Sequence, residues 1–203
     1  MDVTIIGTGN MARGIATRAL AGGHSVTLLG TSADKAAVLA GELGEGVAAG
    51  TVGDPATGDL VVLAVPYAAA ADLARSYDGT VLVDITNPVD FSDFEPIAPE
   101  AGSAAEEIAA AAPAARVVKA FNTTFAGTLV DGAVAGQPLD VLIAGDDAEA
   151  EARVAQPVSD GGMRPIDAGP LRRARQLEAA GYLHMAVTQT LGAPFATAVK
   201  VLG

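Results

Sequence analysis

A glycine-rich turn near the N-terminus restricts the fold more than any other feature of this sequence. An apolar run, Val3 to Ile6, leads directly into a turn with the pattern G-x-G-x-x-A, and a helical segment follows. This arrangement is typical of a strand-turn-helix unit that binds a dinucleotide. We expect Gly7 to permit the tight turn, Gly9 to let backbone N–H groups approach a diphosphate, and Ala12 to allow close packing of helix on strand. The alternative is a glycine turn that binds nothing. The predicted cofactor contacts in this turn are Gly7, Thr8, Gly9, Asn10 and Met11.

Short apolar runs alternate with alanine-rich stretches along most of the chain. The runs have the length of strands, and the stretches have the length of helices. This alternation predicts an α/β fold with a Rossmann-type, doubly wound and mainly parallel sheet, whose crossovers are right-handed. We expect strands at 3–6, 26–29, 60–65, 81–84, 117–121 and 139–144, and helices at 11–21, 33–43, 68–77, 103–112 and 147–159.

The alternation changes near Gly169. A long helical segment is expected over 171–191, followed by a short tail from Pro194 to Leu202. We therefore predict a dinucleotide-binding Rossmann domain, residues 1–168, and a small C-terminal helical appendage, residues 169–203, that completes the substrate side. The proline- and acid-rich stretch 88–102 is expected to be a long loop after a strand, where α/β enzymes place ligand contacts.

Charge and composition limit the partners of the chain. The sequence has 24 acidic and 12 basic residues, a net charge of −12, which repels nucleic acid and anionic membranes. It has no cysteine, which excludes disulfides and thiolate chemistry. There is no apolar run of about 20 residues and no secretory signal. We therefore expect a cytoplasmic protein with a small-molecule redox substrate and no metal site, and a homodimer is one arrangement left open.

The end of the second predicted strand indicates which dinucleotide is bound. An NAD enzyme usually has Asp or Glu there to accept from the ribose hydroxyls, whereas this chain has Gly30, Thr31 and Ser32. Hydroxyl and backbone donors can bind a 2′-phosphate, and Lys35 lies about one helical turn further on. NADP(H) is therefore the expected cofactor. The alternative is that Thr31 or Ser32 only caps the next helix and Lys35 is solvated.

Several short motifs, in a fixed order, resemble one known family. They are Gly7-Thr8-Gly9-Asn10, Ala64-Val65-Pro66, Thr86-Asn87-Pro88, Lys119-Ala120-Phe121-Asn122-Thr123, Ala144-Gly145-Asp146-Asp147 and Asp167-Ala168-Gly169-Pro170-Leu171. Together they resemble the deazaflavin (coenzyme factor 420)-dependent NADP oxidoreductases, which are related to the cytosolic reductase domains of membrane ferric reductases. The resemblance covers nearly the whole chain.

The resemblance implies hydride transfer between the nicotinamide and a deazaflavin or flavin co-substrate, with no catalytic protein nucleophile. The cofactors then carry the chemistry, and the protein positions them. By the same resemblance, residues after three strands border the dinucleotide and approach its nicotinamide. Asn122 can hydrogen-bond a carboxamide or a substrate carbonyl, or it can satisfy its own turn. These further cofactor contacts are Ala64, Val65, Pro66, Asn87, Pro88, Ala120 and Asn122.

The chain departs from the family pattern in two places. Many relatives have an arginine beside the 2′-phosphate where this chain has Thr31 and Ser32. Deazaflavin enzymes often have histidine where this chain has Asn122, and the asparagine is more similar to the ferric and flavin reductases. The acceptor is therefore less firmly predicted than the dinucleotide.

Two other function classes remain open from the sequence. One is a dinucleotide-binding module without catalysis, such as a regulator. The other is an NADPH-dependent carbonyl or imine reductase, which needs a proton donor beside the hydride. Tyr67, Tyr182 and His184 are the few donors available.

The start of the C-terminal helix carries three arginines, Arg172, Arg173 and Arg175. They would attract an anionic tail on a substrate, or Arg175 would form an ordinary surface pair with Glu178 at i,i+3 spacing. Leu183 and Met185 are expected in the core or in a dimer interface rather than at the cofactor.

Overall fold

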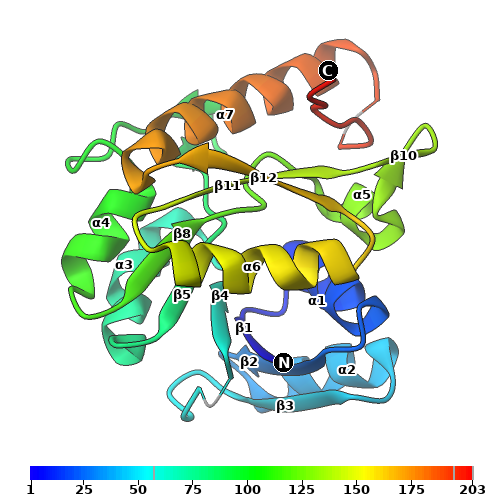
Figure 1. Ribbon diagram of the computed structural model, residues 1–203, viewed down its shortest axis with the longest axis vertical. Helices are drawn as coiled ribbons and strands as arrows, with labels where there is room; N and C mark the ends of the chain where they lie inside the picture. The colour runs from blue at the N-terminus through cyan, green and yellow to red at the C-terminus, as the bar shows by residue number, and fades with distance from the viewer. Residues whose placement is uncertain (57, 194, 203) are drawn as a thin grey trace.

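One eight-stranded sheet forms the centre of the molecule (Figure 1). The computed structural model describes residues 1–56, 58–193 and 195–202, so the Pro194 start predicted for the tail lies outside the described residues. The strand order is β12-β11-β8-β5-β4-β1-β2-β3. The strands are β1 (Asp2–Ile6), β2 (Ser25–Gly30), β3 (Val47–Thr51), β4 (Leu60–Leu63), β5 (Val81–Asp84), β8 (Arg116–Lys119), β11 (Asp140–Gly145) and β12 (Arg164–Gly169).

Six neighbouring strands of the sheet, β8, β5, β4, β1, β2 and β3, are parallel to one another, as the mainly parallel prediction requires. The chain order reverses between β1 and β4, which is the switch point where open α/β sheets bind ligands. β11 runs antiparallel to β8, and β12 is parallel to β11. After β8, no crossover helix returns the chain to the other end of the sheet. The chain instead passes through α5 (Ala126–Asp131) and enters β11 beyond the carboxyl end of β8.

Helices cover both faces of the sheet. The core side chains place α1 (Asn10–Ala21), α2 (Ala33–Leu43), α5 and α6 (Ala148–Asp160) on one face. They place α3 (Tyr67–Ala74) and α4 (Ala104–Ala111) on the other. α7 (Ala174–Thr190) lies along one end of the molecule, and the C-terminal segment folds back beside its end (Figure 1). The smaller elements are the 3-10 turns η1 (Arg75–Tyr77) and η2 (Leu171–Arg173) and the hairpins β6 (Val89–Asp90) with β7 (Glu95–Pro96) and β9 (Ala133–Val134) with β10 (Gln137–Pro138).

Several sequence predictions of local structure are confirmed. Helix α1 ends at Ala21, the last residue expected for it, and Gly22 is its C-cap residue. Ser103 caps α4 by accepting from the Glu106 backbone N–H, and its hydroxyl donates to the Glu106 carboxylate. The stretch 88–102 is mostly loop, although it contains the β6-β7 hairpin. In the described part of the chain, no helix has both the length and the apolar character needed to cross a membrane.

A buried ammonium group joins the sheet to the C-terminal helix. Asp84 and Lys119 are register partners on β5 and β8, and both side chains are inaccessible to solvent. The Lys119 Nζ donates to Asp84 Oδ2 at 2.7 Å, to the Thr86 carbonyl at 2.6 Å and to Glu178 Oε1 at 2.7 Å. The carboxylate of Glu178 also accepts from the Ala104 backbone N–H of α4. Lys119 and Glu178 together thus link two strands and two helices.

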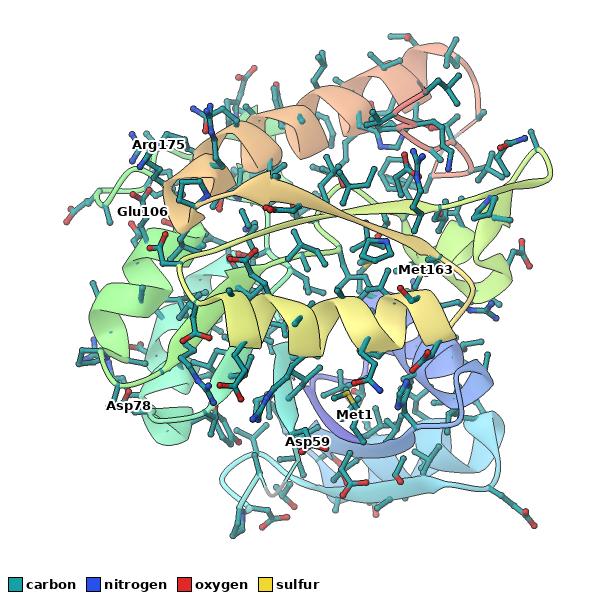
Figure 2. The ribbon with its side chains drawn as sticks, in the orientation of Figure 1. Met1, Asp59, Asp78, Glu106, Met163 and Arg175 are labelled. Atoms are coloured by element: carbon teal, nitrogen blue, oxygen red, sulfur yellow. The ribbon has the colours of Figure 1, made fainter. Side chains whose placement is uncertain are left out.

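The position of Glu178 corrects the sequence interpretation. The i,i+3 spacing suggested a surface pair with Arg175, but Glu178 is 5% exposed and faces Lys119. Burial raises the pKa of Glu178, while Lys119 opposes that shift. Arg175 instead pairs with Glu106 at 2.9 Å, at the α4 end of α7 (Figure 2). The sequence could not show this because the partners lie on different elements.

Replacing Lys119 with methionine should destabilise the fold strongly. The substitution leaves the carboxylates of Asp84 and Glu178 buried without their cation, and breaking a buried pair in this way costs about 3–5 kcal/mol. Urea unfolding at neutral pH measures the difference. Arg153→Met is the matched control, since its pair with Glu149 is largely exposed and should contribute less than about 1 kcal/mol. Similar losses in the two variants would contradict this account.

Candidate functional site

A cavity of about 860 Å³ lies at the carboxyl ends of the parallel strands. Its walls come from the loops after β1, β4, β5 and β8, and from α5, α7 and the C-terminal tail. It therefore includes the switch point between β1 and β4. The lining residues are Gly9, Asn10, Met11, Arg13, Ala64, Val65, Pro66, Tyr67, Ile85, Thr86, Asn87, Phe91, Asn122, Thr124, Phe125, Ala126, Gly127, Val130, Met185, Phe195 and Ala196.

The glycine turn forms one end of the cavity. Gly7 has a φ of +124°, and a Cβ there would lie 2.2 Å from the Ala64 carbonyl oxygen, so only glycine fits. Gly9 is the N-cap residue of α1, where no side chain caps the helix. A Cβ at Gly9 would meet nothing within 4 Å. The first N–H groups of α1 thus face free space, as a diphosphate site requires.

Two asparagines form the polar floor of the cavity. The Asn87 Nδ2 donates to the Asn122 carbonyl at 2.8 Å, which fixes the orientation of the Asn87 amide. The Asn122 Nδ2 then donates to Asn87 Oδ1 at 2.9 Å and to the Leu177 carbonyl at 2.8 Å. Both partners are acceptors, so the remaining Asn122 atom is the oxygen Oδ1. This oxygen is buried and has no hydrogen-bond partner among the described residues.

The hydroxyl of Thr86 is a second buried polar group without a partner in the described structure. Thr86 also lines the cavity, and its backbone carbonyl accepts a hydrogen bond from Lys119. An unpaired buried polar atom is costly, and these two belong to residues that line one cavity.

Close packing of α7 fixes the asparagine pair. A Cβ at Gly181 of α7 would lie 2.7 Å from Asn87 Oδ1 and 2.9 Å from the Asn122 carbonyl. The turn before Asn122 is also constrained, because Phe121 is left-handed with a φ of 60°. Such non-glycine residues are uncommon and cluster at functional sites.

Aromatic side chains also line the cavity. Phe125 stacks edge-on against Phe195 of the tail, with ring centroids 5.2 Å apart. Phe91, from the loop between β6 and β7, is 70% exposed at the cavity. Met185 is buried and lines the same space, so it is a cavity residue as well as a core residue. Leu183, in contrast, is 62% exposed.

Two polar clusters hold the tail in place. The carboxylate of Asp140 accepts from Arg164, Lys200 and the Val201 backbone N–H. Burial alone would raise the pKa of Asp140, but the bonds from Arg164 and Lys200 keep it well below its usual range.

The second cluster centres on His184. Its Nδ1 lies 3.2 Å from the Thr123 carbonyl, and its Nε2 lies 2.8 Å from the Thr197 hydroxyl of the tail. The carbonyl needs a donor, so Nδ1 carries the proton and Nε2 accepts. Burial lowers the pKa of His184, which favours this neutral ring. His184 does not line the cavity.

A second depression of about 310 Å³ lies between α1 and α2. Thr8, Arg13 and Lys35 line this α1-α2 groove, together with Asp34, Val38, Leu39 and Glu42. Thr31 is exposed at the end of β2. Ser32 occupies the N-cap position of α2, but its side chain makes no capping hydrogen bond. Its hydroxyl is therefore not used by the helix.

Some predicted residues do not reach the cavity. Pro88 and Ala120 are buried and are not among its lining residues. The three arginines that open η2 and α7 do not line it either. The sequence assigned the C-terminal appendage to the substrate side, but it singled out no lining residue of α5, α7 or the tail, since their apolar side chains carry no motif. It also missed Arg13, although Arg13 directly follows the glycine fingerprint.

Only one of the three proton-donor candidates lines the cavity. Tyr67 does, and its hydroxyl donates to Glu107 Oε2 at 2.8 Å. Burial and this bond raise the pKa of Tyr67 to about 12. The hydroxyl of Tyr182 points to the Phe94 carbonyl.

Comparisons with known proteins agree with this architecture. The family model described as "NADP oxidoreductase coenzyme F420-dependent" matches residues 2–88. The rat protein Metalloreductase STEAP3 is 34% identical over 178 residues, which are 87% of this chain and 36% of that protein. This chain thus spans about a third of the length of that relative.

Two solved bacterial structures resemble nearly the whole chain. A candidate F420-dependent NADP-reductase from Arthrobacter sp. FB24 is 30% identical with a TM-score of 0.82, covering 99% of each chain. A hypothetical protein from Sinorhizobium meliloti is 28% identical with a TM-score of 0.77, covering 89% of this chain and 88% of the other.

Proposed function

This chain belongs to the family of coenzyme F420-dependent NADP oxidoreductases, and from that premise we propose that it transfers a hydride between NADP(H) and a deazaflavin or flavin-like planar acceptor. The observation that carries this proposal is the buried Oδ1 of Asn122, which has no partner among the described residues and belongs to a residue that lines the cavity at the uncapped end of α1. The diphosphate would lie over Gly9, and the nicotinamide would extend toward Asn122.

Asn122 is suited to a carboxamide and not to a substrate carbonyl. Its free atom is an acceptor, so it can take an N–H from the nicotinamide carboxamide but can donate nothing. The free Thr86 hydroxyl can donate to the carboxamide oxygen. The two groups together would orient the ring, and Asn87 and Gly181 keep Asn122 in place.

The aromatic wall suits the acceptor. Phe125, Phe195 and Phe91 offer apolar ring surface to the cavity. When bound, the nicotinamide supplies the hydride and the planar acceptor receives it. The protein needs no nucleophile for this step; it aligns the two rings and excludes water.

Turnover with a planar acceptor tests the proposal. Purified protein mixed with NADPH and a panel of deazaflavin and flavin acceptors should consume NADPH, followed by its absorbance. Asn122→Ala should raise the KM for NADPH about tenfold, since it removes one buried hydrogen bond to the carboxamide. Binding of NADPH without turnover on any acceptor would instead favour the non-catalytic module.

Tyr67 favours a second candidate, the reduction of a carbonyl or imine. It is the one proton donor of the three candidates that lines the cavity. With a pKa of about 12, it stays protonated throughout the neutral range, and its hydroxyl would have to turn from Glu107 to give a proton to a substrate. If this candidate holds, Tyr67→Phe should lower ketone or imine reduction roughly a hundredfold and leave NADPH affinity unchanged. Undiminished reduction by Tyr67→Phe would remove the candidate.

Thr31 is proposed to set the preference for NADP(H). Thr31 is exposed at the end of β2, where it would offer the ribose a hydroxyl and no carboxylate. Thr31→Asp should invert the preference, because it repels the 2′-phosphate and offers NADH an acceptor for its ribose hydroxyls. We expect NADPH to bind one to two decades more weakly. Titration of both cofactors measures the ratio, and an unchanged ratio would place the 2′-phosphate elsewhere.

A further inference from the structure

Arg13 occupies a position shared by two ligand spaces. It lies in the first turns of α1, and its side chain lines both the main cavity and the α1-α2 groove. In the groove it shares the walls with Thr8, from the glycine turn, and Lys35, from the first turn of α2. A group that touched Thr8 and Lys35 would therefore be within reach of a guanidinium.

The groove holds equal numbers of positive and negative side chains. Arg13 and Lys35 oppose Asp34 and Glu42. The Arg13 Nη2 pairs with the Glu42 carboxylate, and the side chains of this pair are 41% and 49% exposed. Pairs so exposed contribute little to stability and are readily exchanged. A phosphate offers a guanidinium a doubly charged and bidentate partner instead.

We infer that Arg13 recognises the 2′-phosphate of NADP(H), and that Glu42 holds the guanidinium in the groove until the phosphate replaces it. This inference rests on the proposed use of NADP(H). It also explains how the chain could bind the 2′-phosphate without an arginine at Thr31 or Ser32, because the guanidinium would come from α1 and not from the end of β2. Lys35 and the hydroxyl of Ser32 would then meet the same phosphate from α2.

The two possible roles of Glu42 predict different effects on ligand binding when its carboxylate is removed. If Glu42 only braces α1 against α2, its removal should weaken every ligand or none. If it competes with the phosphate, its removal should favour ligands that carry a 2′-phosphate and leave the others unchanged.

Calorimetric titration of NADPH and NADH into the full chain tests the inference. Arg13→Gln should weaken NADPH binding by about ten- to a hundredfold while NADH stays within about twofold. Glu42→Gln should tighten NADPH binding and leave NADH unchanged. Arg153→Gln is the matched control, because it opens another exposed pair far along the chain and should change neither cofactor. Equal weakening of both cofactors by Arg13→Gln, or no change in either, would overturn the inference.

A second pair of probes separates this inference from the proposed function. Adenosine 2′,5′-bisphosphate and 5′-AMP differ in the 2′-phosphate and contain no nicotinamide. An Arg13-dependent preference for the bisphosphate, without turnover on any acceptor, would keep the inference and reject the proposed hydride transfer. The inference alone would be rejected by a different result. In that case Arg13→Gln would turn over NADPH as the wild type does, and both proteins would prefer the bisphosphate over 5′-AMP to the same degree.

Discussion

The buried ammonium of Lys119 is the interaction on which the site depends. It sits between the carboxylates of Asp84 and Glu178 and also holds the Thr86 carbonyl. Lys119 links the adjacent strands β5 and β8 where they end at the cavity, and its bond to Glu178 holds α7 against them. Only then can Gly181 meet the asparagine pair and Leu177 accept from Asn122. A buried charge is expensive, so this arrangement is stable only with all its partners present.

The sheet could be predicted where burial on both faces leaves an apolar run. Such runs occur in β1, β2, β4 and β5. β3 was missed because Val47–Thr51 is an edge strand of small and partly exposed residues. β12 was missed because Arg164–Gly169 contains proline and charge and lies at the other edge. Strand direction was also hidden, since the reversal at β11 follows from the lack of a crossover helix between β8 and β11.

The site residues also divide into those that the sequence could predict and those that it could not. Residues that follow strands, such as Gly9, Val65, Asn87 and Asn122, were predictable because parallel strands end at one edge. Glu178 was not, since it meets Lys119 across 59 positions of sequence. The aromatic wall was not either: a phenylalanine in a core and one beside a ligand look the same in a sequence.

The C-terminal tail imposes an order of assembly. Phe195 and Ala196 line the cavity, yet they follow every strand and helix of the fold. A chain made N-terminus first can pair its eight strands and form the glycine turn before these residues are added. The glycine-turn side of the cavity can thus form before the side that Phe195 and Ala196 close, and the cavity is complete only when α7 and the tail have joined the sheet.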